Sequence, residues 1–141
     1  QKDAAEVAVL RQIVRDLDFP VEMVICPTVR ESDGLAMSSR NRYLSPEERR
    51  QALSLPRALA AAQKLSAQGE SGAANLLEEM SVTLQQEPAV RVDYLAVVDP
   101  DTLLPLQDVS ARGLLAIAAY VGSTRLIDNI LLPAALTGKL P

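Results

Sequence analysis

The chain has 141 residues, 48% hydrophobic and 23% charged, with a formal net charge of −4. This is the length and composition of one ordinary globular domain, which argues against a disordered chain. The absence of histidine excludes a Ser-His-Asp triad and an imidazole metal site within the chain. The acidic balance and the few aromatic side chains argue against a nucleic-acid partner.

The cysteine content and the start of the chain bear on its setting. Cys26 is the single cysteine, so no internal disulfide or thiolate zinc cluster can form, and a reducing cytoplasm is expected. No apolar run approaches the roughly 18 residues of a membrane span, so no membrane partner is expected. The chain opens Gln1-Lys2-Asp3, without an initiator methionine or a signal peptide. We therefore expect a piece or processed product of a longer protein.

The first predicted elements are a helix and a strand. Over residues 4–17 apolar side chains recur at helical spacing, and Asp3 stands at the N-cap position. Pro20 keeps the residue before it out of the helical region. Residues 21–26 (VEMVIC) predict a buried strand of a parallel sheet, with Cys26 as a small core residue at its end. Such a helix–turn–strand unit is typical of the end of a doubly wound sheet whose partner strands lie upstream.

A loop and two helices are predicted next. Residues 27–41 (PTVRESDGLAMSSRN) are polar and show no sustained periodicity. The sequence Ser45-Pro46-Glu47-Glu48 combines a hydroxyl N-cap, a proline at the first helical position and the glutamate of a capping box. We expect this helix to reach about Gln68 and to bend at Pro56. A break at residues 69–72 then separates it from a second helix over about residues 73–86.

The rest of the chain is predicted to be β-structure. Short apolar runs separated by turn residues indicate an antiparallel sheet, which the two helices would cover in an α+β layout. The sequence Asp99-Pro100-Asp101 is typical of a turn with Asx-type hydrogen bonds. The predicted elements are strands over residues 90–98, 103–106 (weakened by Pro105), 113–121 and 124–132, a turn at Gly122 and a tail over 133–141.

Two polar clusters near the start are candidate phosphate sites. Lys2 and Asp3 precede a helix, where an ammonium, exposed amides and the helix dipole would converge on an anion. The alternative is a fraying terminus with a capping aspartate. Ser38-Ser39-Arg40-Asn41 follows Gly34, whose flexibility would let the loop close. Its hydroxyls and guanidinium suit the charge that grows on a departing pyrophosphate. The alternative here is a solvated connector.

Two other clusters are weaker candidates. Asp99 and Asp101 resemble paired carboxylates or a cation site, but turn chemistry explains both. Thr124-Arg125 and Asp128-Asn129 on the last strand could reach a ligand. Sheet packing and an ion pair explain Arg125 and Asp128 better.

Three stretches carry a family resemblance. The segment PTVRESDGLAMSSRNRYLSPEERRQA resembles the signature of the pantothenate synthetase family, ATP-dependent ligases that join pantoate to β-alanine. QKDAAEVAVLRQIVRDL resembles the family's Gly-x-Lys-Asp helix start, and GSTRLIDNILL resembles a late stretch. The resemblance covers nearly the whole chain in order. Family members are longer, so this chain resembles their C-terminal half. The other half carries most of the Rossmann-like domain and a paired-histidine motif that handles ATP.

The resemblance implies an α/β fold class with two parts and a tail. Residues 1–28 would be the last helix–strand unit of a Rossmann-like nucleotide-binding domain. Residues 29–133 would form a small α+β lid domain with an antiparallel sheet and two helices, and residues 134–141 a tail. The implied protein is a cytoplasmic homodimeric ligase of pantothenate and coenzyme A biosynthesis. It would use ATP with bound Mg²⁺, pantoate and β-alanine through a pantoyl-adenylate intermediate, and this chain alone is expected to be inactive.

The resemblance also implies roles for individual residues. Lys2 would contact phosphate, Asp3 would lie nearer the ribose, and Val29 would hold adenine through its backbone. The full implied ATP-binding set is Gln1, Lys2, Asp3, Val29, Met37, Ser38, Ser39 and Arg40. Met37 to Arg40 would form the loop that closes over the phosphates, with Ser38, Ser39 and Arg40 as its catalytic residues, and no residue would bind a metal.

One position departs from the family pattern. The family has a glutamine that hydrogen-bonds pantoate where this chain has Glu6. A carboxylate there accepts but does not donate, and it repels an anionic substrate, which puts the pantoate contact in doubt. Two alternatives to the family assignment are another adenylate-forming nucleotidyltransferase of the same superfamily and a non-catalytic α+β interaction module.

Overall fold

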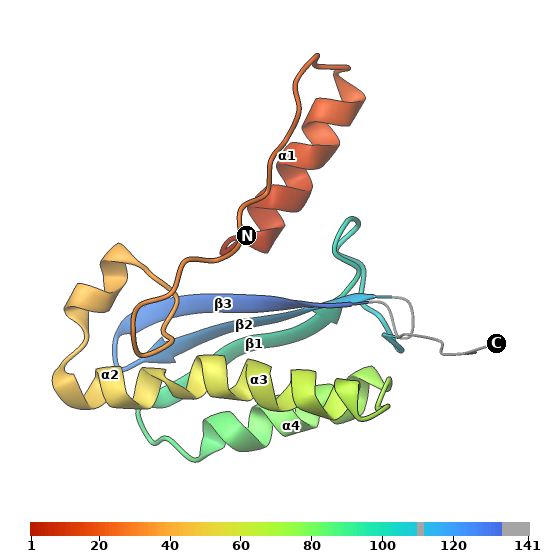
Figure 1. The fold of residues 1–141 in the computed structure, drawn as a ribbon. Coiled ribbons are helices and arrows are strands. Elements are labelled where there is room, and N and C mark those ends of the chain that lie inside the picture. The colour runs from red at the N-terminus through yellow and green to blue at the C-terminus, as the bar shows by residue number, and fades with distance from the viewer. Residues whose placement is uncertain (110–111, 134–141) are drawn as a thin grey trace.

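The computed structural model describes residues 1–109 and 112–133. In this part of the chain, two helices lie against a three-stranded antiparallel sheet and another helix projects away from it (Figure 1). The elements in chain order are α1 (Ala4–Asp16), the 3₁₀ helix η1 (Ser39–Tyr43), α2 (Pro46–Ala52), α3 (Ser54–Ala67), α4 (Ala73–Gln85), β1 (Val90–Val98), β2 (Gly113–Val121) and β3 (Thr124–Leu132).

The sheet has the strand order β1-β2-β3, so each strand pairs with its neighbour in sequence. Val98 pairs with Leu114 and Gly113 with Leu132, and the β1–β2 register shifts between Val92 and Tyr94. The predicted turn at Gly122 joins β2 to β3, with φ of +57°, a conformation that glycine adopts without the steric cost of a Cβ. The predicted antiparallel sheet and its three long strands are therefore confirmed.

The core lies between the sheet and the pair α3–α4 (Figure 1). Each helix presents an apolar stripe, and alternate residues of β2 point to the same layer. Burying one such aliphatic side chain contributes about 1.5–3 kcal/mol relative to leaving it exposed. Side chains at the centre of this core, 2% exposed or less, are Leu55, Leu59, Leu76, Met80, Leu84, Leu115, Ile117 and Val121.

The long helix expected from Pro46 to about Gln68 is broken earlier than predicted. The structure has two helices, α2 and α3, separated at Leu53 rather than bent at Pro56. Pro56 lacks the N–H that would donate to the Ala52 carbonyl, and its ring crowds the same carbonyl. The break therefore falls in the turn before the proline. The capping box at the start of α2 is confirmed in both of its hydrogen bonds.

The buried parallel strand predicted for residues 21–26 is wrong for this structure. The segment carries no strand assignment and runs back alongside α1 (Figure 1). Val21 and Val24 are 59% and 76% exposed, and Cys26 is exposed rather than a core residue. A strand needs a neighbouring strand to hydrogen-bond its backbone groups, and no strand of the described residues pairs with residues 21–26. The apolar face of α1 is likewise uncovered at Leu10, Ile13 and Leu17.

The short strand predicted for residues 103–106 does not form. Leu103 has φ of +60°, and Pro105 makes only an isolated bridge with Val98. A positive φ is outside the β region, and proline cannot donate to a ladder. Most of the predicted tail, residues 134–141, lies outside the described residues. Within the described part, no helix is both long and apolar enough to span a membrane.

Candidate functional site

The predicted polar loop is a small hairpin with a defined backbone. Met37 N–H donates to the Val29 carbonyl across 2.9 Å, and Glu31 N–H donates to the Leu35 carbonyl across 2.8 Å. Gly34 turns the chain between them with φ of +94°, which few residues other than glycine adopt. Leu35 is 3% exposed, so the tip of the hairpin is anchored in the core. Gly34 therefore serves a tight turn.

A network of charged and amide groups ties this hairpin to η1 and α2. Arg49 donates to the Glu31 and Asp33 carboxylates, in each case across 2.7 Å. Asn41 Nδ2 donates to Glu31 across 2.6 Å and to the Ala36 carbonyl across 3.1 Å. The hydrogen bonds from Asn41 and then Arg49 lower the pKa of the Glu31 carboxyl, because they stabilise its charged form. The network fixes the direction in which η1 leaves the hairpin.

Ser38 begins η1 and positions the residues after it. Its extended backbone is that of an N-cap, and its Oγ accepts a hydrogen bond from the Arg40 N–H across 3.2 Å. The Ser38 carbonyl accepts from the Asn41 N–H. The turn therefore leaves Arg40 on the exposed side of η1, while Asn41, 7% exposed, points into the protein.

The opposite wall of the site comes from β3. Asp128, whose side chain is 2% exposed, binds the Arg30 guanidinium through both oxygens, across 2.7 and 3.0 Å. Its neighbour Asn129, 4% exposed, donates through Nδ2 to the carbonyls of Gln1 (2.9 Å) and Lys2 (2.8 Å). β3 thus holds both the hairpin and the residues that precede α1.

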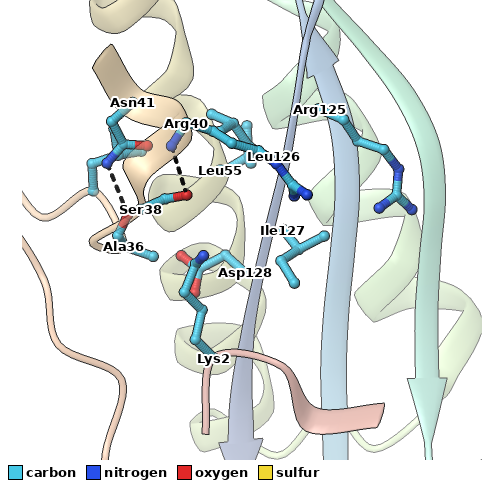
Figure 2. Close-up of a pocket in the computed structure, with 11 residues that line it drawn as sticks. Lys2, Ala36, Ser38, Arg40, Asn41, Leu55, Arg125, Leu126, Ile127 and Asp128 are labelled. Carbon is cyan, nitrogen blue, oxygen red and sulfur yellow. Dashed lines mark hydrogen bonds between the residues drawn. The ribbon is translucent and has the colours of Figure 1, made fainter. Parts of the chain in front are cut away.

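A shallow pocket lies where these segments meet (Figure 2). Lys2 and Arg40 both line it, and neither forms an ion pair with a carboxylate of the described residues. Arg125, also at the pocket, is paired with Asp93 across 2.8 Å. The pocket is lined by Lys2, Leu35, Ala36, Ser38, Arg40, Asn41, Leu55, Arg125, Leu126, Ile127 and Asp128. Two unpaired cations beside a hydroxyl suit an anion such as phosphate.

The pocket brings together some of the predicted site residues and not others. Lys2, Ser38 and Arg40 line it, although their segments are far apart in sequence. Asp3 caps α1 as predicted, since its Oδ1 accepts from the Glu6 N–H across 3.0 Å. The other predicted residues lie outside the pocket lining: Gln1, Asp3, Glu6, Val29, Met37 and Ser39.

Sequence reasoning missed the residues that build the walls of the pocket. The local patterns do not single out Arg30, Glu31 or Arg49, and the ion pair expected for Arg125 and Asp128 does not join these two residues. The structure pairs Asp128 with Arg30 and Arg125 with Asp93. The signal that could have identified Asp128 is an Asp-Asn pair in the otherwise apolar end of β3, since buried polar groups need partners.

The carboxylate of Asp99 serves a turn, as predicted, whereas that of Asp101 forms ion pairs. Asp99 Oδ1 accepts from the backbone N–H groups of Thr102 (2.8 Å) and Asp101 (3.0 Å), which lowers the pKa of the Asp99 carboxyl. Asp101 pairs with Arg11 and Arg112. Among the residues that the structure describes, no three His, Cys, Asp or Glu side chains gather in a way that could hold a metal ion.

Comparisons with known proteins agree along most of the chain. A family model described as Pantoate-beta-alanine ligase matches residues 1–131. The chain is 62% identical over 138 residues to a pantothenate synthetase of Acidobacterium capsulatum, covering 96% of this chain and 46% of that protein. It is 50% identical over 141 residues to one of Koribacter versatilis, covering 100% and 48%. The chain therefore spans about half the length of the curated relatives it matches.

Solved structures show the same fold. A pantothenate synthetase of Thermus thermophilus is 49% identical and superposes with a TM-score of 0.87, covering 94% of this chain and 48% of that chain. A pantoate-beta-alanine ligase of Francisella tularensis, solved with beta-gamma ATP and beta-alanine, is 24% identical with a TM-score of 0.58. It covers 92% of this chain and 41% of its own, and shares the fold.

Proposed function

Because this chain belongs to the pantoate-beta-alanine ligase family, we propose that the protein in which it occurs joins pantoate to β-alanine at the expense of ATP. The pantoate carboxylate attacks the α-phosphorus of ATP, pyrophosphate leaves, and pantoyl adenylate forms. The β-alanine amine then attacks the acyl carbon, and AMP leaves with the former carboxylate oxygen, which gives pantothenate. The observation that carries the proposal is the pocket where Lys2, Ser38 and Arg40 converge.

The three pocket residues fit the departing pyrophosphate. Lys2 and Arg40 offer charge-assisted hydrogen bonds, which are about twice as strong as neutral ones. Ser38 Oγ already accepts from the Arg40 N–H, so its own hydrogen is left to donate to a phosphate oxygen. Positive charge placed where negative charge grows lowers the barrier to phosphoanhydride cleavage. Their role is to orient and neutralise the triphosphate.

The remaining residues of the expected ATP site lie outside the pocket lining, on the segments that carry Lys2, Ser38 and Arg40. Val29 offers a free backbone N–H to adenine, since only its carbonyl is engaged by Met37. Ser39 and Met37 are exposed beside Ser38 and belong to the same closing loop. Gln1 and Asp3 flank Lys2, with Asp3 nearer the ribose. Glu6, one helical turn beyond Asp3, stands where the family pattern has the glutamine that binds pantoate, and its own contact with pantoate stays a prediction.

The larger assembly of the protein is also part of the proposal. Residues 1–28 would be the end of a Rossmann-like domain, the rest of which would cover the apolar face of α1. Residues 29–133 form the lid over the nucleotide. Mg²⁺ enters with the ATP phosphates, as the resemblance implies. The homodimer and the cytoplasmic compartment stay predictions from the resemblance and the cysteine content.

The test uses the protein in which the chain occurs, at its natural length, here called the parent protein. With ATP, Mg²⁺, pantoate and β-alanine it should release pyrophosphate and form pantothenate, detected by mass spectrometry. Arg40→Ala should lower kcat by roughly 10²–10³-fold, the effect of losing one transition-state charge partner. Arg42→Ala is the matched control, since Arg42 lies on the same 3₁₀ helix but outside the pocket lining.

Other outcomes distinguish the alternative functions. Pyrophosphate release with carboxylates other than pantoate would indicate a different adenylate-forming enzyme. Unchanged turnover in both Ser38→Ala and Arg40→Ala would mean that the Ser-Ser-Arg segment is incidental. The 141-residue chain by itself should release no pyrophosphate above background, because it contains no histidine to handle ATP.

A further inference from the structure

Consecutive residues of β3 hold the two segments that bring cations to the pocket. Asn129 Nδ2 binds the carbonyls of Gln1 and Lys2, which fixes the backbone that carries the Lys2 ammonium. Asp128 binds Arg30 at the base of the hairpin that leads to Arg40. Asp128 Oδ1 also accepts from the Asn129 N–H across 2.8 Å. Adjacent residues of one strand therefore contact both segments.

Asp128 brings a negative charge to a pocket that otherwise suits an anion. Its carboxylate lines the pocket, and Figure 2 shows the Lys2 side chain extending toward it. The Asp128 side chain is 2% exposed, so water does not solvate its charge. The Arg30 guanidinium binds both carboxylate oxygens instead. A buried carboxylate that loses its partner is destabilised, and pairing with another nearby cation would reduce that cost. Among the residues that line the pocket, the cations without an ion pair are Lys2 and Arg40.

We propose that Arg30 and Asn129 are positioning residues that keep Lys2 and Arg40 free to bind an anionic ligand, Arg30 by neutralising the Asp128 carboxylate and Asn129 by holding the Lys2 backbone. Arg30 binds and neutralises the Asp128 carboxylate. This carboxylate therefore neither pairs with Lys2 or Arg40 nor repels a phosphate. Asn129 holds the Lys2 backbone at the pocket wall. The kinetic test of this inference rests on the proposed ATP-dependent ligation. The measurement of ATP binding does not depend on that function.

The decisive experiment is a charge-rescue cycle in the parent protein. Arg30→Met exposes the Asp128 charge to the pocket and should raise the Kd for ATP, measured by calorimetric titration, at least about tenfold. Adding Asp128→Asn removes that charge, and the double variant should return to within about threefold of the unsubstituted protein. The same pattern should appear in the KM for ATP. Because removing an unpaired buried charge can also restore stability, the Kd values are compared at a temperature at which circular dichroism shows both variants to be folded.

The matched control is Arg57→Met. Arg57 also binds a buried carboxylate, Glu87, across 2.6 Å, but outside the pocket lining. Arg57→Met should leave the Kd for ATP unchanged. Three results would each overturn the charge role: a Kd for ATP that rises equally in Arg57→Met, a Kd that does not change in Arg30→Met, or a double variant that binds ATP as weakly as Arg30→Met. If Arg30→Met does not fold, Asp128→Asn alone should bind ATP as tightly as the unsubstituted protein or tighter, and a tenfold weaker Kd would overturn the inference.

Asn129 is tested separately. Asn129→Ala frees the carbonyls of Gln1 and Lys2, and should weaken ATP binding and lower kcat/KM, each by roughly tenfold. Asn75→Ala is the control, because Asn75 is an exposed amide that binds Glu70 outside the pocket lining. Equal effects of the two substitutions would overturn the role of Asn129. If the unsubstituted parent protein makes no pantothenate, the proposed function fails, while the ATP titrations still decide the positioning role.

Discussion

Asn41 Nδ2 donates to the Glu31 carboxylate across 2.6 Å, and this bond joins the end of the Ser38–Arg40 segment to the start of the hairpin before it. The same nitrogen donates to the Ala36 carbonyl across 3.1 Å. Asn41 is 7% exposed, so water does not replace these bonds easily. The orientation of Arg40 toward the pocket depends on this buried amide.

Replacing Asn41 by leucine should destabilise the fold. The substitution keeps the volume but leaves the buried Ala36 carbonyl and the Glu31 carboxylate short of a donor, which should lower the free energy of unfolding by about 1–3 kcal/mol. Urea denaturation followed by circular dichroism measures the change. Asn75→Leu, at an exposed amide that also binds a glutamate, should change it by much less. Equal midpoints for the two variants would contradict the prediction.

Gly122→Ala should be more destabilising than Gly69→Ala. Both glycines have positive φ, +57° and +105°, so both substitutions strain the backbone by at least about 1–2 kcal/mol. At Gly122 the added Cβ would also overlap the Glu48 carboxylate, which is held by the capping box of α2, whereas nothing lies within 4 Å of it at Gly69. Thermal unfolding of the two variants gives the comparison. A Gly69→Ala midpoint at or below that of Gly122→Ala would show that the overlap is relieved without cost.

The lowered pKa of the Glu47 carboxyl predicts that the protein loses stability in acid. Hydrogen bonds from Arg50 and Gln51 lower the pKa of the Glu47 carboxyl from 4.5 to about 2. A carboxyl whose pKa is lower in the folded state stabilises the protein above its unfolded pKa, and this contribution is lost as pH falls from about 4.5 to about 2. Glu47→Gln should therefore flatten the pH dependence of the urea midpoint over this range. Glu78→Gln, at an exposed position on α4, should leave the dependence as it is. Identical curves for Glu47→Gln and the unsubstituted protein would contradict the assignment.

Glu6→Gln tests the departure from the family pattern. If Glu6 faces pantoate, the substitution removes a repulsion between two carboxylates and adds a donor, and the KM for pantoate should fall roughly threefold to tenfold. The KM for ATP should not change, because Glu6 lies outside the pocket lining. Steady-state kinetics of the parent protein separates the two constants. A KM for pantoate that does not change would place pantoate away from this residue.

Local patterns in the sequence predicted most elements with the right bounds. The capping box at Ser45 and Glu48 involves residues three apart, and the strands over residues 90–98, 113–121 and 124–132 match the structure residue for residue. These features depend on neighbours in sequence and on burial of one face of the sheet, so periodicity suffices to find them. The strand predicted for residues 21–26 is wrong for the opposite reason, because a strand depends on a partner distant in sequence. An apolar run becomes a strand only where another strand pairs with it.

The sequence by itself determined which groups were available to bind an anion: the ammonium of Lys2, the hydroxyl of Ser38 and the guanidinium of Arg40. Only the tertiary structure decided that these groups share one pocket, because Lys2 and Arg40 are carried there by separate segments that meet on β3. The contacts that hold them come from Asp128 and Asn129, about ninety residues further along the chain than Arg40. Side chains so distant in sequence become neighbours through the antiparallel pairing of β3 with β2 and the packing of η1 against β3, which no local pattern encodes.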